Sequence, residues 1–212
     1  MRKLFLLVVM AFGAFTMQAQ DFNFGVKLGG NFNKMTISGD DAEYSKYLKG
    51  ALGFQIGALG EYSFNEQFSI LGEINFITIN DKIYHETEAY GISVINDVKA
   101  YSSYIEIPIM AKYYINESFS IETGPQIGFL QSGTYKGTYT INGEVDIREG
   151  DTELSCNATG FNIGASYKLE NGLFFNARYV IGLNDIDKEA GSITKNNTFQ
   201  ISIGYFFNGS MF

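Results

Sequence analysis

The chain is poor in the residues that build most catalytic and metal sites. It has one cysteine, one histidine, two prolines and no tryptophan among 212 residues. The lone Cys156 excludes an internal disulfide, and His85 lies far from it in the sequence. Phosphate-binding glycine loops, the nucleophile elbow and the zinc-protease motif are all missing. We therefore predict a protein that is not an enzyme and has no cofactor and no metal site.

Positive charge is also scarce. Lys and Arg number 15 against 23 Asp and Glu, which gives a formal net charge of −8. Proteins that bind nucleic acids usually carry a basic footprint. This balance excludes a nucleic-acid partner.

Long hydrophobic runs are missing as well. Only the N-terminal stretch "MRKLFLLVVMAFGAFTMQAQ" contains an extended apolar run, from Leu4 to Phe15, and it falls short of the roughly 18 residues that a helical membrane span needs. Arg2 and Lys3 precede that run, as in a secretory signal peptide. We predict a cleaved signal peptide over residues 1–20 and one exported domain over residues 21–212.

Strand-forming residues dominate what is present, with 19 Phe, 14 Tyr and 24 Gly. Eight segments alternate apolar and polar residues with a period of two, which predicts strands. Each is longer than the usual strand of about 5 to 6 residues and long enough for the about 9 to 11 residues of a strand that crosses a bilayer. The segments are Phe22–Phe32, Ala51–Phe64, Phe68–Thr78, Tyr101–Tyr114, Phe119–Leu130, Gly160–Leu169, Leu173–Leu183 and Asn197–Phe207.

The connections between these segments alternate between short and long. The short ones span 65–67, 116–118 and 170–172, and the long ones span 33–50, 79–100, 131–159 and 184–196. Short turns on one rim and long loops on the other are typical of outer-membrane barrels. We predict an all-β fold, an eight-stranded antiparallel up-and-down transmembrane β-barrel with short periplasmic turns and long extracellular loops. A soluble lipocalin-like barrel that binds an apolar ligand remains the alternative, because its strands alternate too.

The charged residues of the predicted strands all share the polar face of their strand. We expect them to point into the lumen and to form a structural ion-pair network, because a buried charge without a partner is costly. A proton or ion path is the alternative role. These residues are Lys27, Glu61, Glu73, Glu106, Lys112, Glu122, Lys168 and Arg178.

Aromatic residues on the apolar face gather at the two ends of the strands, with aliphatic residues between them. Lipid–water interfaces select such belts, so this sorting favours the membrane barrel over the soluble one. Near the short turns the belt is Tyr62, Phe64, Phe68, Tyr113, Phe119, Tyr167, Tyr205 and Phe207. Near the long loops it is Phe32, Phe76, Tyr101, Phe129, Phe161, Tyr179 and Phe199.

The long loops are acidic overall and are the expected place of specific function. Their carboxylates either keep the loops soluble or bridge lipopolysaccharide through divalent cations; Asp185, Asp187 and Glu189 alternate in the last one. The third loop, 131–159, contains "GTYKGTYTINGEVDI" with Asn-Gly at its centre, which is a hairpin signal. We expect it to extend outward as a β-ribbon whose edges can bind an extracellular partner.

Several stretches resemble the outer-membrane β-barrel family of Bacteroidota, known as porin-family or PorT-like. They are "YIEIPIMAKYY", "TGPQIGFL", "FNIGASYKLENGLFFNARYVIGLNDI" and "ISIGYFF". The resemblance implies an eight-stranded barrel in the bacterial outer membrane but no defined activity. It departs from the family at the tail, where "NGSMF" follows Phe207.

For an outer-membrane barrel of this kind we expect a structural or surface-interaction role. The alternative is a secretion-accessory or small-solute transport barrel. The expected partners are outer-membrane lipid and lipopolysaccharide, together with the barrel-assembly machinery. We expect a monomer.

Overall fold

The computed structural model describes residues 22–39, 48–89, 92–142, 144–151, 157–185 and 192–207. The predicted signal peptide, Cys156 and the tail after Phe207 lie outside the described residues. The strands are β1 (Phe22–Gly39), β2 (Leu48–Ser63), β3 (Phe68–Ala89), β4 (Ile92–Tyr114), β5 (Phe119–Ile141), β6 (Glu144–Asp151), β7 (Asn157–Lys168), β8 (Leu173–Gly182) and β9 (Ser192–Phe206). Within the described part of the chain, no helix is long and apolar enough to cross a membrane.

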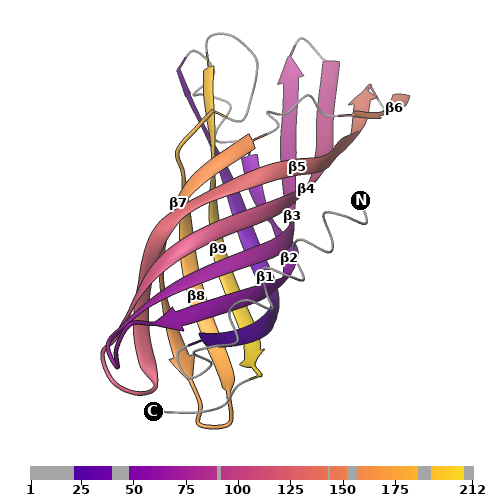
Figure 1. Cartoon of the computed structure of the whole chain (residues 1–212). Coiled ribbons are helices and arrows are strands. Elements are labelled where there is room, and N and C mark those ends of the chain that lie inside the picture. Colours follow the sequence, from indigo (N-terminus) through magenta and orange to yellow (C-terminus); the bar gives the residue numbers. More distant parts are fainter. Residues whose placement is uncertain are drawn as a thin grey trace, which may run out of the picture.

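Eight of these strands form a closed antiparallel ring. Each ring strand pairs with the ring strands before and after it in the sequence, β4 pairs with β5, and β1 closes the ring by pairing with β9. Strand β6 is outside the ring and pairs with the outer part of β5. The prediction of an eight-stranded up-and-down barrel is confirmed (Figure 1).

The outer ends of the strands run farther than the sequence predicted. β3 and β4 stay paired as far as Ala89 and Ile92, so the prediction of a loop over residues 79–100 is wrong. β1 and β9 likewise stay paired out to Gly39 and Ser192. Outside a membrane the backbone can keep pairing without an apolar outer face. The hydrophobic alternation therefore ends before the strand does.

The ribbon predicted in the third long connection is confirmed. β5 and β6 form a hairpin in which Ile141 pairs with Glu144. Asn142 begins the turn with a φ of 49°, a left-handed conformation that Asn tolerates. In Figure 1, β6 projects away from the barrel at the end opposite the short turns.

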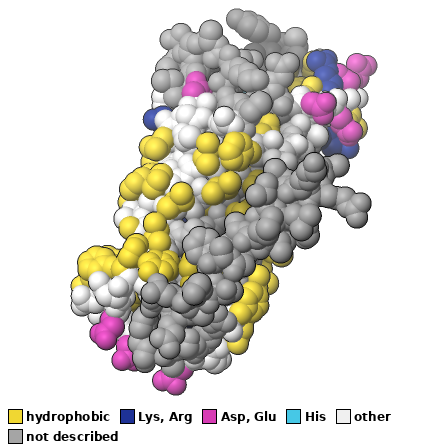
Figure 2. All heavy atoms as spheres, in the orientation of Figure 1, with side chains coloured by type: hydrophobic (Ala, Val, Ile, Leu, Met, Phe, Trp, Pro, Cys, Tyr) yellow, Lys and Arg dark blue, Asp and Glu magenta, His cyan; other side chains and the backbone are white. Residues whose placement is uncertain are grey.

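The apolar face of the barrel points outward. Ile109 and Ile121 are 54% and 47% exposed, whereas Glu106 and Lys112 are 6% and 4% exposed. Hydrophobic side chains cover much of the barrel surface visible in Figure 2. A lipocalin-like barrel would have the reverse polarity, so the structure does not favour that alternative.

Apolar side chains also occupy the lumen near both ends. A lower cluster, near the short turns, consists of Leu59, Leu71, Met110, Phe174 and Phe206. An upper cluster consists of Ile77, Ile79 and Tyr104, with Leu130 and Ala158 packed against them. Polar side chains fill much of the space between the two clusters.

The first two short turns share one local design. The Asn65 Oδ1 atom accepts hydrogen bonds from the backbone N–H groups of Gln67 and Phe68 at 2.9 and 2.8 Å. Asn116 does the same for Ser118 and Phe119 at 3.0 and 2.8 Å. Asn favours such turns because its side chain mimics a backbone acceptor.

Candidate functional site

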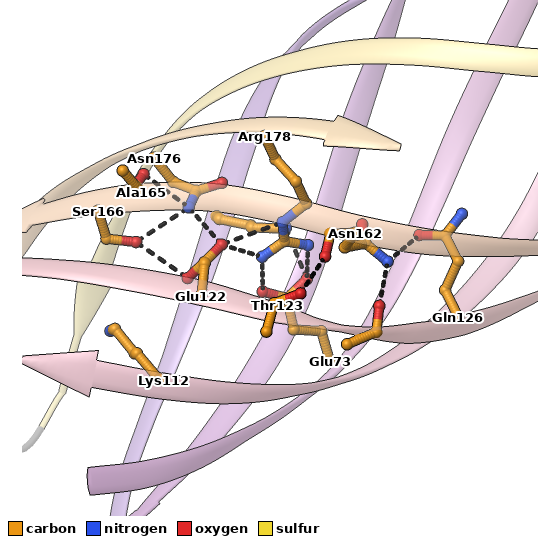
Figure 3. A network of polar contacts seen from close by, with 12 residues as sticks. Glu73, Lys112, Glu122, Thr123, Gln126, Asn162, Ala165, Ser166, Asn176 and Arg178 are labelled. Atoms are coloured by element: carbon orange, nitrogen blue, oxygen red, sulfur yellow. Dashed lines mark hydrogen bonds and ion pairs between the residues drawn. The ribbon is translucent and has the colours of Figure 1, made fainter. Parts of the chain in front are cut away.

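The centre of the lumen is organised around Arg178 of β8, which is 1% exposed. Its Nη1 and Nη2 atoms donate to the two carboxylate oxygens of Glu73 on β3 at 3.0 and 2.9 Å. Its Nε and Nη2 atoms donate to Glu122 Oε1 on β5 at 3.0 and 2.7 Å. One guanidinium therefore joins three strands of the barrel wall (Figure 3).

A second cation completes this central cluster. Lys27 Nζ of β1 lies 2.6 Å from Glu73 Oε2, and Asn75 donates to the same oxygen at 2.8 Å. Asn176 and Ser166 donate to Glu122 at 2.6 and 3.1 Å. Two cations thus meet two carboxylates, and neutral side chains supply further donors to the carboxylate oxygens.

A separate ion pair lies closer to the short turns. Lys112 Nζ is 3.0 Å from Glu61 Oε2. The hydroxyl groups of Tyr114 and Ser69 donate to Glu61 Oε1 at 2.6 and 2.7 Å. Lys112 also lies over the Tyr114 ring, 4.8 Å from its centroid.

The last two predicted lumen residues stand apart from these pairs. Glu106 accepts a hydrogen bond from Gln126 at 3.1 Å, and among the described residues no cation lies within ion-pair distance of it. Lys168 is half-buried near the short turns, with Nζ 5.9 and 5.8 Å from the ring centroids of Tyr114 and Phe206. Six of the eight predicted residues are therefore joined in ion pairs.

The backbones of β4 and β5 approach each other closely at Gly124. Gly124 of β5 faces inward, and a Cβ atom there would fall on the backbone carbonyl oxygen of Ile109. The ladder between the two strands is interrupted at this level, between the Pro108–Gln126 and Ala111–Thr123 pairs. Only glycine lets the two backbones come this close.

Sequence reasoning missed the neutral half of the lumen. Buried amides at Asn31, Gln55, Asn75, Asn162, Asn176 and Gln200 share the inner face with the charges. Their signal was their place in the same period-two pattern. A neutral amide at such a position is equally compatible with the protein surface, so the pattern alone did not assign these residues to the lumen.

A polar group at the outer mouth of the barrel was missed as well. Asn33 donates to Asp81 Oδ1 at 2.8 Å and accepts from the Thr198 hydroxyl at 3.0 Å. Asp81 lies beyond the predicted membrane-spanning part of β3. Burial raises the pKa of its carboxyl to about 6, although the hydrogen bond from Asn33 works in the opposite direction.

A small cavity lies among the described lumen residues below this mouth. Its volume is about 20 Å³, and it lies among Tyr104, Glu106, Gln126 and Thr198. That volume suffices for about one water molecule.

All the predicted belt residues lie on the outer face, where each is exposed or partly exposed. Phe64 and Phe207 near the short turns are 64% and 59% exposed, and Tyr179 at the other end is 46% exposed. Their position at the lipid–water interfaces stays a prediction.

The outer parts of β3, β4 and β5 join β6 in a sheet beyond the barrel mouth, which we call the outward sheet. Lys136 and Glu149 form an ion pair across β5 and β6 at 2.5 Å. Arg148 of β6 binds Asp146 at 2.8 Å and lies over the Tyr139 ring. Among the described strands β6 pairs only with β5, so its other edge has no strand partner.

Comparison with known proteins gives one family and several structures of related shape. The family described as outer membrane protein beta-barrel domain matches residues 18–188. No curated protein is recognisably similar in sequence.

Three solved structures illustrate the likeness in shape. Ail, the attachment invasion locus protein of Yersinia pestis, in complex with the heparin analogue sucrose octasulfate, is 17% identical, with 89% of this chain and 100% of that chain covered and a TM-score of 0.44. Neisserial surface protein A is 13% identical, with 86% and 96% covered and a TM-score of 0.47. The N-terminal β-barrel domain of Pseudomonas aeruginosa OprF is 9% identical, with 86% and 97% covered and a TM-score of 0.31.

Proposed function

Because the chain belongs to the outer membrane protein beta-barrel domain family, we propose that it is a surface-interaction protein built on a closed barrel. In this proposal the charge-paired lumen is structural and carries no solute. The outward sheet contacts a partner outside the cell. The finer assignment to a PorT-like family of Bacteroidota stays a prediction.

The filled lumen is the observation that carries the closed-barrel part of the proposal. The ion pairs around Arg178 and Glu61 span the interior, and apolar clusters lie near both ends. An eight-stranded barrel is just wide enough for its side chains to fill it. An ion crossing this lumen would have to break several buried ion pairs.

Conductance in planar bilayers tests this part. We expect the purified, refolded protein to give no stable single-channel current at neutral pH. A reproducible current that scales with the amount of inserted barrel would contradict the closed lumen and favour the transport alternative.

The geometry of β6 supports the surface-interaction part. Val145 and Ile147 are 60% and 58% exposed on an edge strand that projects beyond the barrel. An edge strand offers unpaired backbone N–H and C=O groups to an incoming strand. Exposed apolar side chains beside such an edge add contact area.

Crosslinking in intact cells, followed by co-purification, tests the surface role. We expect the double variant Val145→Ser with Ile147→Ser to recover at least about fivefold less crosslinked partner than the wild type. The control is Ile115→Ser, since Ile115 is 57% exposed at the opposite rim. Equal recovery from all three proteins would overturn the role of β6.

A further inference from the structure

The outer wall of the barrel contains an apolar groove between β3, β4, β5 and β7. Its volume is about 490 Å³. Ala111 and Thr123 pair with each other and form the floor, and Ile70 and Ile163 flank them in the same row of the sheet. The Thr123 hydroxyl donates to the Asn162 carbonyl at 2.9 Å, so the floor presents no unsatisfied hydroxyl. The groove is therefore an apolar depression in the outer wall, with larger side chains around it.

This groove lies at the short-turn end of the barrel. Its lower lining consists of Phe64, Phe68 and Tyr113, and the rings of Phe68 and Tyr113 lie 4.9 Å apart. The Tyr114 N–H donates to the Gln67 carbonyl at 2.8 Å, which joins the strands that lead to the first two short turns. The lower end of the groove thus lies beside both turns.

Each of these two turns presents an exposed glutamate, Glu66 and Glu117. Neither carboxylate forms an ion pair with another described residue. The turns are held by the side chains of Asn65 and Asn116, so the fold does not require the neighbouring residue to be acidic. Figure 2 shows acidic side chains at the short-turn end of the molecule, below the hydrophobic surface.

We propose that this groove holds an acyl chain of a phospholipid from the periplasmic leaflet, and that Glu66 and Glu117 select a headgroup that carries an amine. In an outer-membrane barrel the short turns face the periplasm, so lipid of that leaflet covers the groove. Carboxylates attract the ammonium of phosphatidylethanolamine and repel the net negative charge of phosphatidylglycerol. The apolar groove binds the chain, and the acidic rim discriminates between headgroups.

A tryptophan reporter tests the proposal, because the chain has no tryptophan of its own. The Tyr113→Trp variant places a single indole beside the groove. It is reconstituted in phosphatidylcholine vesicles that contain equal fractions of brominated phosphatidylethanolamine or brominated phosphatidylglycerol, since bromine quenches tryptophan fluorescence on contact. We expect the ethanolamine lipid to associate with the reporter roughly threefold more strongly, as two exposed charge contacts allow.

Two further variants separate the headgroup and chain contributions. Glu66→Gln with Glu117→Gln in the reporter background should remove the preference while quenching by both lipids persists. Ala111→Leu should fill the groove and weaken quenching by both lipids. Its matched control is Ala177→Leu, because Ala177 is exposed on β8 and does not line the groove.

A second reporter position tests whether the preference is local. Tyr179 lies on β8 at the opposite end of the barrel and is 46% exposed, so Tyr179→Trp should show no comparable preference between the two lipids. Equal quenching by both lipids at position 113, or the same preference at both positions, would overturn the proposal. Neither result bears on the closed lumen or on the role of the outward sheet.

Discussion

Glu73 and Arg178 face each other across the barrel and form a two-pronged ion pair, although 105 residues separate them in the chain. Glu73 is on β3 and Arg178 is on β8, so the pair joins distant parts of the ring. Such parallel N–H···O contacts fix geometry as well as supplying energy. The central cluster therefore acts as an internal brace between the walls.

Removing one member of this brace should be severely destabilising. Glu73→Gln leaves Lys27 without its ion-pair partner and takes from Arg178 one of its two carboxylates. Uncompensated buried charge typically costs about 3 to 5 kcal/mol. We expect a loss of that size in the free energy of unfolding, measured by urea unfolding in lipid vesicles. The exposed Glu170 is the control, and Glu170→Gln should change stability by less than about 0.5 kcal/mol; similar losses for both would contradict the brace.

Adjacent phenylalanines on β8 test the polarity of the barrel. Phe174 packs in the lower lumen cluster, whereas Phe175 is 46% exposed on the lipid face. Phe174→Ala should cost about 3 to 5 kcal/mol because it leaves a cavity that the surrounding strands cannot close. Phe175→Ala should cost clearly less, since fluid acyl chains fill the space that it leaves. Urea midpoints of the two variants provide the comparison, and the reverse order would contradict an outward apolar face.

Two glycines test the close approach of β4 and β5. Gly124→Ala places a methyl group on the Ile109 carbonyl oxygen, whereas a Cβ on Gly72 meets no atom within 4 Å. We expect Gly124→Ala to lower the unfolding free energy by roughly 1 to 3 kcal/mol, as overpacking does. Gly72→Ala should leave it nearly unchanged. The temperature at which the folded band disappears in detergent gels ranks the two variants. Equal temperatures would show that β4 and β5 shift enough to accept the added methyl group.

The half-buried carboxyl of Asp81 should make stability depend on pH. Burial raises its pKa from 3.8 to about 6, so the folded state binds the proton more tightly than the unfolded state. Its contribution to stability is complete below about pH 4 and is lost as the pH rises through about 6. The loss is at most about 3 kcal/mol.

The matched variant for this titration is Asp81→Asn. It should abolish the part of the pH dependence between pH 4 and 6 that is due to Asp81. Urea midpoints measured at pH 4, 5, 6 and 7 for wild type and variant give the difference. Parallel pH profiles would show that Asp81 does not titrate in this range.

The membrane-spanning strands were readable from the sequence because lipid and lumen impose opposite requirements on alternate residues. Charges such as Lys27 and Glu122 could be assigned to the lumen for that reason. Their partners could not be assigned, because strand tilt decides which residues meet across the ring. Glu106 and Lys168 share the face of the paired residues but are not in ion pairs with them.

The outward sheet could be predicted from the sequence only in part. The Asn-Gly pair after Ile141 predicted one hairpin. The β3–β4 extension has no Asn-Gly pair before Ile92 and no regular alternation of apolar and polar residues. Its strands are stabilised by backbone pairing and by local contacts such as Lys82 with Asp97 at 3.0 Å. Contacts of this kind leave no periodic trace in a sequence.

The pairing of β1 with β9 has a consequence for how the protein forms. Gly25, near the beginning of the barrel, pairs in register with Phe206, near its end. Folding rates fall as the sequence separation between contacting residues grows. The separation between Gly25 and Phe206 covers most of the described residues. The cylinder can therefore shut only after β9 has reached β1, and until then each of these two strands keeps one unpaired edge that is open to pairing with another strand.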